Sequence, residues 1–239
     1  MGTGPERRRS DSLSLVNANE RRLDETGQKP HLLVCIHGAG TFPSVFDAWP
    51  GSFPEWQVLT PDLHAGLDLS TASMSDYANA VIMAAARPVP DAVVGLCGWS
   101  MGGLVALMAA PAVRPDALVL LEPSLPAELA GQDQNVLVKA GTFEPAELWG
   151  RWPEDPPTRP ESALALSERK RGISVPSVNC PLLVVASKTY GEHRGSPVAD
   201  FYGGEIVYFP HLHHVSLVRE VAVRTTISDW LSRVPGTST

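Results

Sequence analysis

The feature that most constrains this chain is one serine, Ser100, in a stretch at residues 97–103 that reads CGWSMGG. A short apolar, β-branched stretch at residues 92–96 precedes it, and an Ala- and Leu-rich run at residues 104–110 follows and stops at Pro111. This order predicts a strand, a tight turn and a helix. The flanking Gly98 and Gly102 complete the pattern G-x-S-x-G, in which a side chain at either glycine would collide with the neighbouring strand or helix.

A serine at the top of such a turn is suited to nucleophilic chemistry. The strained turn lifts the hydroxyl group clear of the sheet, and the helix start offers the backbone N–H of Met101 to a developing negative charge. Short G-x-S-x-G matches also arise by chance, as ordinary Gly/Ser turns. Here the strand and the helix both stand where the chemistry requires them, which favours the functional interpretation.

Composition excludes several classes of protein. The chain has 239 residues, enough for one large domain, and 44% of them are hydrophobic, without an apolar run near the length of a membrane span. The first ten residues are polar and no apolar stretch follows them, so we do not expect them to form a secretory signal. The net charge of −7, with no basic stripe, argues against nucleic acid as a partner.

The cysteines indicate the compartment. Cys35, Cys97 and Cys180 are odd in number and widely scattered, and two of them lie in apolar strand-like runs. This pattern is typical of buried thiols and not of a disulfide framework. We therefore expect a reducing, cytoplasmic location.

Apolar stretches along the chain predict a mainly parallel sheet. The expected strands are at residues 31–36, 56–60, 92–96, 117–121, 181–186 and 205–209. One helix is expected after a capping pair formed by Ser73 and Asp76. Three more are expected at residues 104–110, near 198–202 and from 215 to 231. Strands that alternate with helices favour an α/β fold with about six strands buried on both faces.

The domain organisation follows from shifts in composition. Residues 1–28 are polar and are expected to form a flexible N-terminal tail, and residues 29–239 a single domain. From about 125 to 176 prolines cluster and the strand pattern stops, which predicts a small cap insertion with short helices around 127–140 and 161–171. The polar clusters of the chain follow its strands, where parallel sheets bind ligands.

From residue 31 to about 231 the chain resembles the α/β-hydrolase superfamily. The resemblance rests on His37 and Gly38 after one strand, on the G-x-S-x-G turn after another, and on a histidine after the last. It implies that Ser100 is the nucleophile and that the backbone N–H groups of Met101 and Ala39 form the oxyanion hole. It also implies that His37 holds its loop in place.

The resemblance places the general base after the last strand, where three histidines compete. His214 fits best, because an apolar segment and an acidic residue follow it; His213 is the alternative base, and His211 the third candidate. The spacing also resembles a metal site, but a nearby Asp and further ligands are missing, so we expect no metal.

The acid is where this sequence departs from the family. Its usual place is the turn at residues 187–194, which contains no Asp. Glu122, at the end of a strand and followed by a proline, is the favoured acid, because rigid elements position catalytic groups better than loops. Glu192, late in the usual turn, is the alternative acid, and Asp62 a weaker one.

A serine, a histidine and an acid with an oxyanion hole predict acyl transfer to water, without a cofactor. We expect hydrolysis of an ester, lactone or thioester of a modest-sized, largely apolar small molecule. Residues that could line the pocket are Trp99, Phe143, Trp149 and Trp152, although these could instead pack the cap onto the sheet. A lyase or cyclase of the same fold, and a ligand-binding protein with a weakened triad, are the alternatives.

Overall fold

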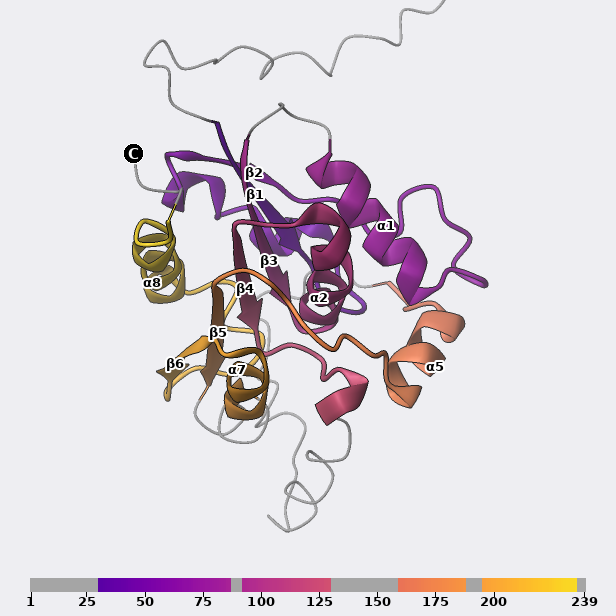
Figure 1. The fold of residues 1–239 in the computed structure, drawn as a ribbon. Coiled ribbons are helices and arrows are strands. Elements are labelled where there is room, and N and C mark those ends of the chain that lie inside the picture. The colour runs from indigo at the N-terminus through magenta and orange to yellow at the C-terminus, as the bar shows by residue number, and fades with distance from the viewer. Residues whose placement is uncertain (1–29, 87–91, 130–158, 188–194, 236–239) are drawn as a thin grey trace, which may run out of the picture.

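Six parallel strands form a single sheet in the order β2-β1-β3-β4-β5-β6 (Figure 1). The computed structural model describes residues 30–86, 92–129, 159–187 and 195–235. The strands are β1 (His31–Ile36), β2 (Trp56–Leu59), β3 (Val93–Trp99), β4 (Ala117–Leu121), β5 (Leu182–Ser187) and β6 (Glu205–Phe209). The predicted α/β fold with about six mainly parallel strands is confirmed.

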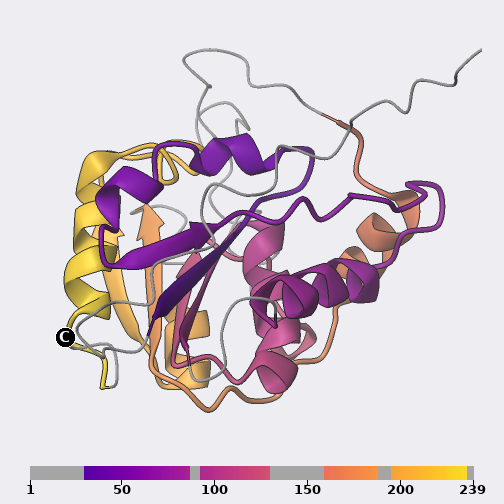
Figure 2. The ribbon, with the colours of Figure 1, turned by 90° about the horizontal axis from the view of Figure 1, so that it is seen from above.

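Helices cover both faces of this sheet (Figure 2). One face carries α1 (Met74–Ala85), α2 (Met101–Val113) and α7 (Ser196–Tyr202), with α5 (Ala163–Arg171) outside them. The other face carries α8 (Val221–Leu231) and the short 3₁₀ helices η1 (Pro43–Phe46) and η2 (Pro50–Ser52). A third 3₁₀ helix, η3 (Ala127–Leu129), follows β4.

The core consists of two apolar layers, one on each side of the sheet. In β1, Leu32 and Val34 point to the layer beneath α1 and α2, whereas Leu33 and Cys35 point to the layer beneath α8. All four side chains are at most 1% exposed. Successive residues of a strand face opposite sides, so a sheet covered on both faces needs an unbroken apolar run.

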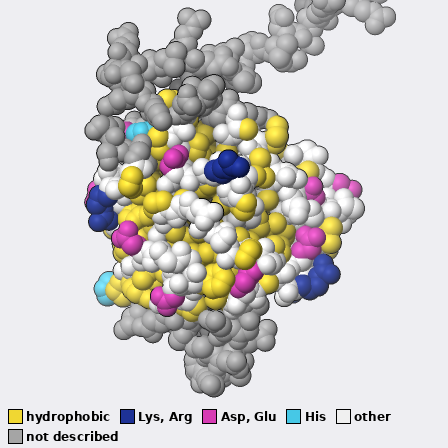
Figure 3. All heavy atoms as spheres, in the orientation of Figure 1, with side chains coloured by type: hydrophobic (Ala, Val, Ile, Leu, Met, Phe, Trp, Pro, Cys, Tyr) yellow, Lys and Arg dark blue, Asp and Glu magenta, His cyan; other side chains and the backbone are white. Residues whose placement is uncertain are grey.

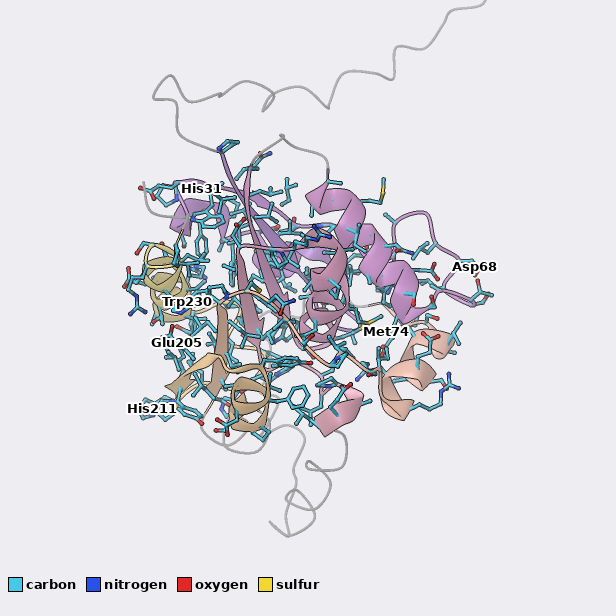
Figure 4. All side chains as sticks on the ribbon, viewed as in Figure 1. His31, Asp68, Met74, Glu205, His211 and Trp230 are labelled. Atoms are coloured by element: carbon cyan, nitrogen blue, oxygen red, sulfur yellow. The ribbon has the colours of Figure 1, made fainter. Side chains whose placement is uncertain are left out.

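The predicted cap of α1 is present. The Ser73 hydroxyl oxygen accepts from the Asp76 N–H at 3.1 Å, and the Asp76 carboxylate accepts from the Ser73 N–H at 2.8 Å. The next N–H, of Met74, donates to the carboxylate of Glu168 on α5 at 2.8 Å, where the two helices meet (Figure 4). The expected short helix near 161–171 is therefore α5, and it rests on the first turn of α1.

Two predicted helix ends are wrong. The helix after Ser100 does not stop at Pro111 but continues to Val113, because a proline near the end of a helix removes only one of the last hydrogen bonds. The last helix begins at Val221 and not at residue 215. Residues 214–219 form turns instead, in which the Val218 carbonyl accepts the Trp49 indole N–H at 2.8 Å.

Several sequence-based expectations lie outside the described residues. These are the N-terminal tail at 1–28, most of the expected helix at 127–140, and four candidate site residues: Phe143, Trp149, Trp152 and Glu192. Within the part of the chain that the structure describes, no helix is long and apolar enough to cross a membrane. On the face shown in Figure 3, acidic and basic side chains are interspersed among apolar and uncharged ones.

The strand order defines where a ligand site belongs. From β1 the chain passes to β2 on one side, and from β3 it proceeds through β4, β5 and β6 on the other. The order therefore reverses between β1 and β3, and the loops that leave their carboxyl ends diverge there. In open parallel sheets this point forms the ligand crevice.

Glycines let the start of α2 approach both of these strands. A Cβ added at Gly98 would lie 2.3 Å from the Gly102 carbonyl oxygen, and one added at Gly102 would lie 2.1 Å from the Ile36 carbonyl oxygen. In both cases the added Cβ would meet a backbone carbonyl oxygen, which cannot move aside as a flexible side chain can. The requirement for glycine on both sides of Ser100 is thus steric.

We predict that Gly102→Ala lowers the free energy of unfolding by about 3 kcal/mol or more, because the methyl group overlaps the Ile36 carbonyl. The matched control is Gly51→Ala, in η2, where a Cβ has no heavy atom within 4 Å and the change should stay within about 0.5 kcal/mol. Urea unfolding of the variants and the wild type measures the difference. Equal midpoints for both variants would contradict the steric explanation.

Candidate active site

Ser100 sits in a strained turn between β3 and α2. Its backbone has φ 57° and ψ −121°, a conformation that side-chain-bearing residues rarely adopt. The end of β4 holds the turn: the Ser100 N–H donates to the Leu121 carbonyl at 2.9 Å, and the Ser100 carbonyl accepts from the Ser124 N–H at 2.9 Å. The nucleophile predicted from the sequence is therefore held by the end of β4 and by the loop that follows this strand.

The structure brings His214 and Glu122 together. His214 Nδ1 lies 2.6 Å from Glu122 Oε2, and the side chains are 2% and 0% exposed. The other carboxylate oxygen, Oε1, accepts from the backbone N–H of Ser187 at 2.7 Å. Glu122 thus has a partner on each oxygen, as a buried carboxylate requires.

The position of Glu122 follows from its place after β4. This strand lies between β3, which carries Ser100, and β5, which ends at Ser187. Glu122 itself has φ 42°, and its N–H donates to the Val185 carbonyl at 3.0 Å. Among the described residues other than glycine, positive φ occurs only at Ser100, Arg114 and Glu122, so backbone strain is found at two of the predicted catalytic positions.

Trp99 connects the histidine loop to the serine turn. Its indole N–H donates to the His214 carbonyl at 3.0 Å, and its ring centroid lies 5.0 Å from that of His214. Trp99 is the last residue of β3 and is 3% exposed. His214 is thereby fixed beside the residue that precedes Ser100. The indole packs between loops, and contact of Trp99 with a substrate stays a prediction.

The loop after β1 also reaches the serine. A Cβ added at Gly38 would lie 2.8 Å from the Trp99 ring and 3.2 Å from Ser100 Cβ. Ala39 follows directly, and Met101 is the first residue of α2, where a backbone N–H has no acceptor within its own helix. The two predicted oxyanion donors thus belong to segments that flank Ser100.

The other two histidines after β6 lie elsewhere. His211 and His213 are exposed, and His211 projects from the periphery beyond the end of β6 (Figure 4). No hydrogen bond of either side chain to a described carboxylate is present. In the described ranges, no group of three or more His, Cys, Asp or Glu residues is placed to hold a metal ion.

His37 has the structural setting that the resemblance implies. Its Nδ1 lies 3.0 Å from the Gly38 carbonyl oxygen, and its Nε2 accepts from the Leu63 N–H at 3.3 Å. Burial, with the nearby charge of Arg159, lowers the pKa of His37 to about 4. The ring is therefore neutral at pH 7, with its proton on Nδ1.

One residue at this site was not found from the sequence. Arg159 donates from Nη1 to Asp62 Oδ2 at 3.0 Å and from Nη2 to Asp62 Oδ1. Burial raises the pKa of Asp62, but hydrogen bonds from Arg159 and from the His64 N–H outweigh it, so the pKa is lowered. Asp62, the weaker acid candidate, is thus engaged by Arg159, and no hydrogen bond joins it to His214.

Comparison with known proteins identifies the family. Residues 33–224 match the model of the Alpha/beta hydrolase family. The chain belongs to this family. The match runs from within β1 into α8 and so includes Ser100, Glu122 and His214. At the level of the family, it supports hydrolase activity.

Similar solved structures share the fold at low sequence identity. A thermophilic esterase from Thermogutta terrifontis has a TM-score of 0.66 and 19% identity, over 87% of this chain and 91% of that chain. The thioesterase RedJ from the prodiginine biosynthetic pathway of Streptomyces coelicolor has a TM-score of 0.58 and 20% identity, over 86% and 91%. MenH from S. aureus has a TM-score of 0.60 and 19% identity, over 86% and 94%. No curated protein matches the sequence.

The lowered pKa of His37 predicts that the folded state loses stability in acid. The unfolded chain binds a proton on this residue below about pH 6.5, whereas the folded chain does so only below about pH 4. Stability therefore falls as the pH drops from 6.5 to 4, by about 1.4 kcal/mol per pH unit from this residue. Urea unfolding at several pH values measures the slope.

The control for this prediction uses two histidine variants. His37→Gln should reduce the slope between pH 6.5 and 4, whereas His211→Gln, at an exposed position, should leave it unchanged. Asp62 contributes only at lower pH, because its own lowered pKa lies below 3.8. A slope that persists in His37→Gln would show that another group takes up the proton.

Proposed function

We propose that this protein is a serine hydrolase that cleaves an ester, lactone or thioester through an acyl-enzyme on Ser100. The observation that carries the proposal is the buried contact of 2.6 Å between His214 Nδ1 and Glu122 Oε2, beside the strained turn of Ser100. A carboxylate that orients a histidine beside a serine is the arrangement that activates the serine hydroxyl group.

In the proposed reaction the Ser100 hydroxyl attacks the carbonyl carbon, and His214 Nε2 takes its proton. The same nitrogen then gives the proton to the leaving oxygen or sulfur as the bond from the carbonyl carbon breaks. In the second half-reaction, His214 Nε2 takes a proton from water as the water oxygen attacks the acyl-serine. The same nitrogen then gives the proton to the Ser100 oxygen as the acid product leaves, which restores the enzyme. Glu122 holds the Nδ1 proton of His214 and stabilises the imidazolium ion that forms in each half-reaction.

The negative charge on the carbonyl oxygen needs donors in fixed positions. The proposed donors are the N–H groups of Met101, at the start of α2, and of Ala39, in the loop after β1. Loss of one such donor typically lowers the rate about 10²- to 10³-fold. This chemistry needs no metal or cofactor, and the proposed partner is a small molecule.

The substrate class stays broad. We propose a modest-sized, largely apolar acyl compound. The similar solved structures include an esterase and a thioesterase, so oxygen esters and thioesters both belong in the first assays.

The first test is covalent labelling with a fluorophosphonate, read by intact mass, together with turnover of p-nitrophenyl butyrate and a butyryl thioester. The wild type should gain one adduct and turn over at least one substrate, and Ser100→Ala should do neither. Labelling without turnover of any acyl substrate would favour a lyase or cyclase. Absence of both would favour a binding protein and overturn the proposal.

The histidine and the acid give a second prediction. His214→Ala should abolish turnover, and Glu122→Gln should lower kcat about 10²- to 10⁴-fold with KM little changed, because the amide no longer stabilises the imidazolium ion. Steady-state kinetics with the substrate that the wild type turns over measure both effects.

The matched controls are the competing residues. His213→Ala and Glu192→Gln should retain activity close to the wild type. If Glu192→Gln is crippling and Glu122→Gln is not, the assignment of the acid is wrong. If His213→Ala abolishes activity and His214→Ala does not, the assignment of the base is wrong.

A further inference from the structure

Arg159 contacts the loop after β1 through backbone and side chain together. Its backbone N–H donates to the Gly40 carbonyl at 3.1 Å, and its Nε donates to the Thr41 carbonyl at 3.2 Å. The guanidinium group also lies 4.2 Å from the centroid of the Phe42 ring. Arg159 is far from this loop in the sequence, and its side chain is only 12% exposed. These contacts hold one side of the loop.

The same guanidinium group reaches two further anchors. It forms a forked pair with Asp62, in the turn after β2, and its Nη2 donates to His37 Nε2 at 3.2 Å. Asp62 is itself oriented, because its Oδ1 accepts the His64 N–H at 3.0 Å. The guanidinium group of Arg159 thus connects the loop that follows β1 with the loop that follows β2. A lysine, with one point charge, could not make this set of bonds.

His37 passes this constraint on to the peptide bond between Gly38 and Ala39. The Gly38 carbonyl oxygen accepts from His37 Nδ1 at 3.0 Å and from the Thr41 hydroxyl at 2.8 Å. In a planar trans peptide the carbonyl oxygen and the following N–H point in opposite directions. Two donors that fix the Gly38 carbonyl therefore fix the direction of the Ala39 N–H. The pKa of His37, lowered to about 4, keeps the ring in the neutral form that this arrangement needs.

We propose that Arg159 is a positioning residue for the oxyanion hole: it orients His37 and the loop at residues 38–42, and through them the Ala39 N–H. This inference rests on the proposed function, which makes the Ala39 N–H an oxyanion donor. Arg159 lies within the predicted cap insertion at about residues 125–176, so a residue of this insertion sets the geometry beside Ser100.

The test compares Arg159 with a second arginine of similar bonding. Arg169 on α5 also forms a forked pair with a carboxylate, from Nε to Glu161 Oε1 at 3.1 Å and from Nη2 to Glu161 Oε2 at 2.7 Å. No bond joins Arg169 to the loop after β1. Arg169→Ala therefore removes a comparable ion pair and serves as the matched control.

Arg159→Ala should lower kcat about 10- to 100-fold with KM within about twofold, because a misdirected donor weakens binding of the transition state more than binding of the substrate. Arg159→Lys keeps the positive charge and serves as a second variant in case Arg159→Ala does not fold. It should also lower kcat. Guanidinium ion at millimolar concentration should restore part of the activity of Arg159→Ala. Arg169→Ala should keep the kcat of the wild type.

Hydrogen–deuterium exchange separates this inference from the proposed function. Peptides that cover residues 37–42 should exchange faster in Arg159→Ala than in Arg169→Ala or Ser100→Ala. If the wild type takes no fluorophosphonate label, the proposed function fails and the role of Arg159 in the oxyanion hole fails with it, even when exchange shows that Arg159 holds the loop. In an active wild type, equal exchange in all variants, or an equal loss of kcat in Arg169→Ala, overturns the inference.

Discussion

The contact between the start of α2 and the end of β1 is the constraint on which the rest of the site depends. Gly102 approaches the Ile36 carbonyl so closely that a methyl group does not fit. This contact sets the separation between the serine turn and the loop that holds Gly38. Hydrogen bonds weaken over a few tenths of an ångström, so donors placed by backbone packing are better defined than donors placed by flexible side chains. The sheet and α2 thus act as the rigid frame of the proposed chemistry.

The proposed acid, Glu122, follows a different strand from the one that the family usually uses. The family usually carries its acid in the turn that follows the strand called β5 in this chain. Here a backbone N–H, that of Ser187, stands at the end of β5 and donates to Glu122, one strand nearer the serine. The carboxylate is fully buried, and such a group is stable only when its oxygens are hydrogen-bonded. The backbone at the end of β5 therefore holds the carboxylate of the proposed acid.

The sequence predicted well whatever depends on local pattern. The expected ranges 31–36, 117–121 and 205–209 coincide with β1, β4 and β6, because buried parallel strands need unbroken apolar runs. The serine turn was predicted from its own pattern, G-x-S-x-G between an apolar strand and a helix, although the contact that requires Gly102 is with the distant Ile36 carbonyl. The predictions of two helix ends were wrong, since contacts with distant residues decide whether the last turn of a segment continues as helix. Arg159 could not be found, because nothing in residues around it marks a partner as distant as Asp62. The contact of Glu122 with His214 is likewise long-range, and the assignment of Glu122 as the acid stays a prediction.

The location of Glu122 also affects how this site could be exchanged between proteins. Ser100 and Glu122 flank α2 within the single unit formed by β3, α2 and β4, and their backbones are hydrogen-bonded to that unit and to β5. One contiguous segment of chain therefore encodes the proposed nucleophile, one oxyanion donor and the acid. Only the histidine and the loop after β1 come from elsewhere. A recombination event that transplants this one segment would therefore transfer most of the proposed catalytic residues together.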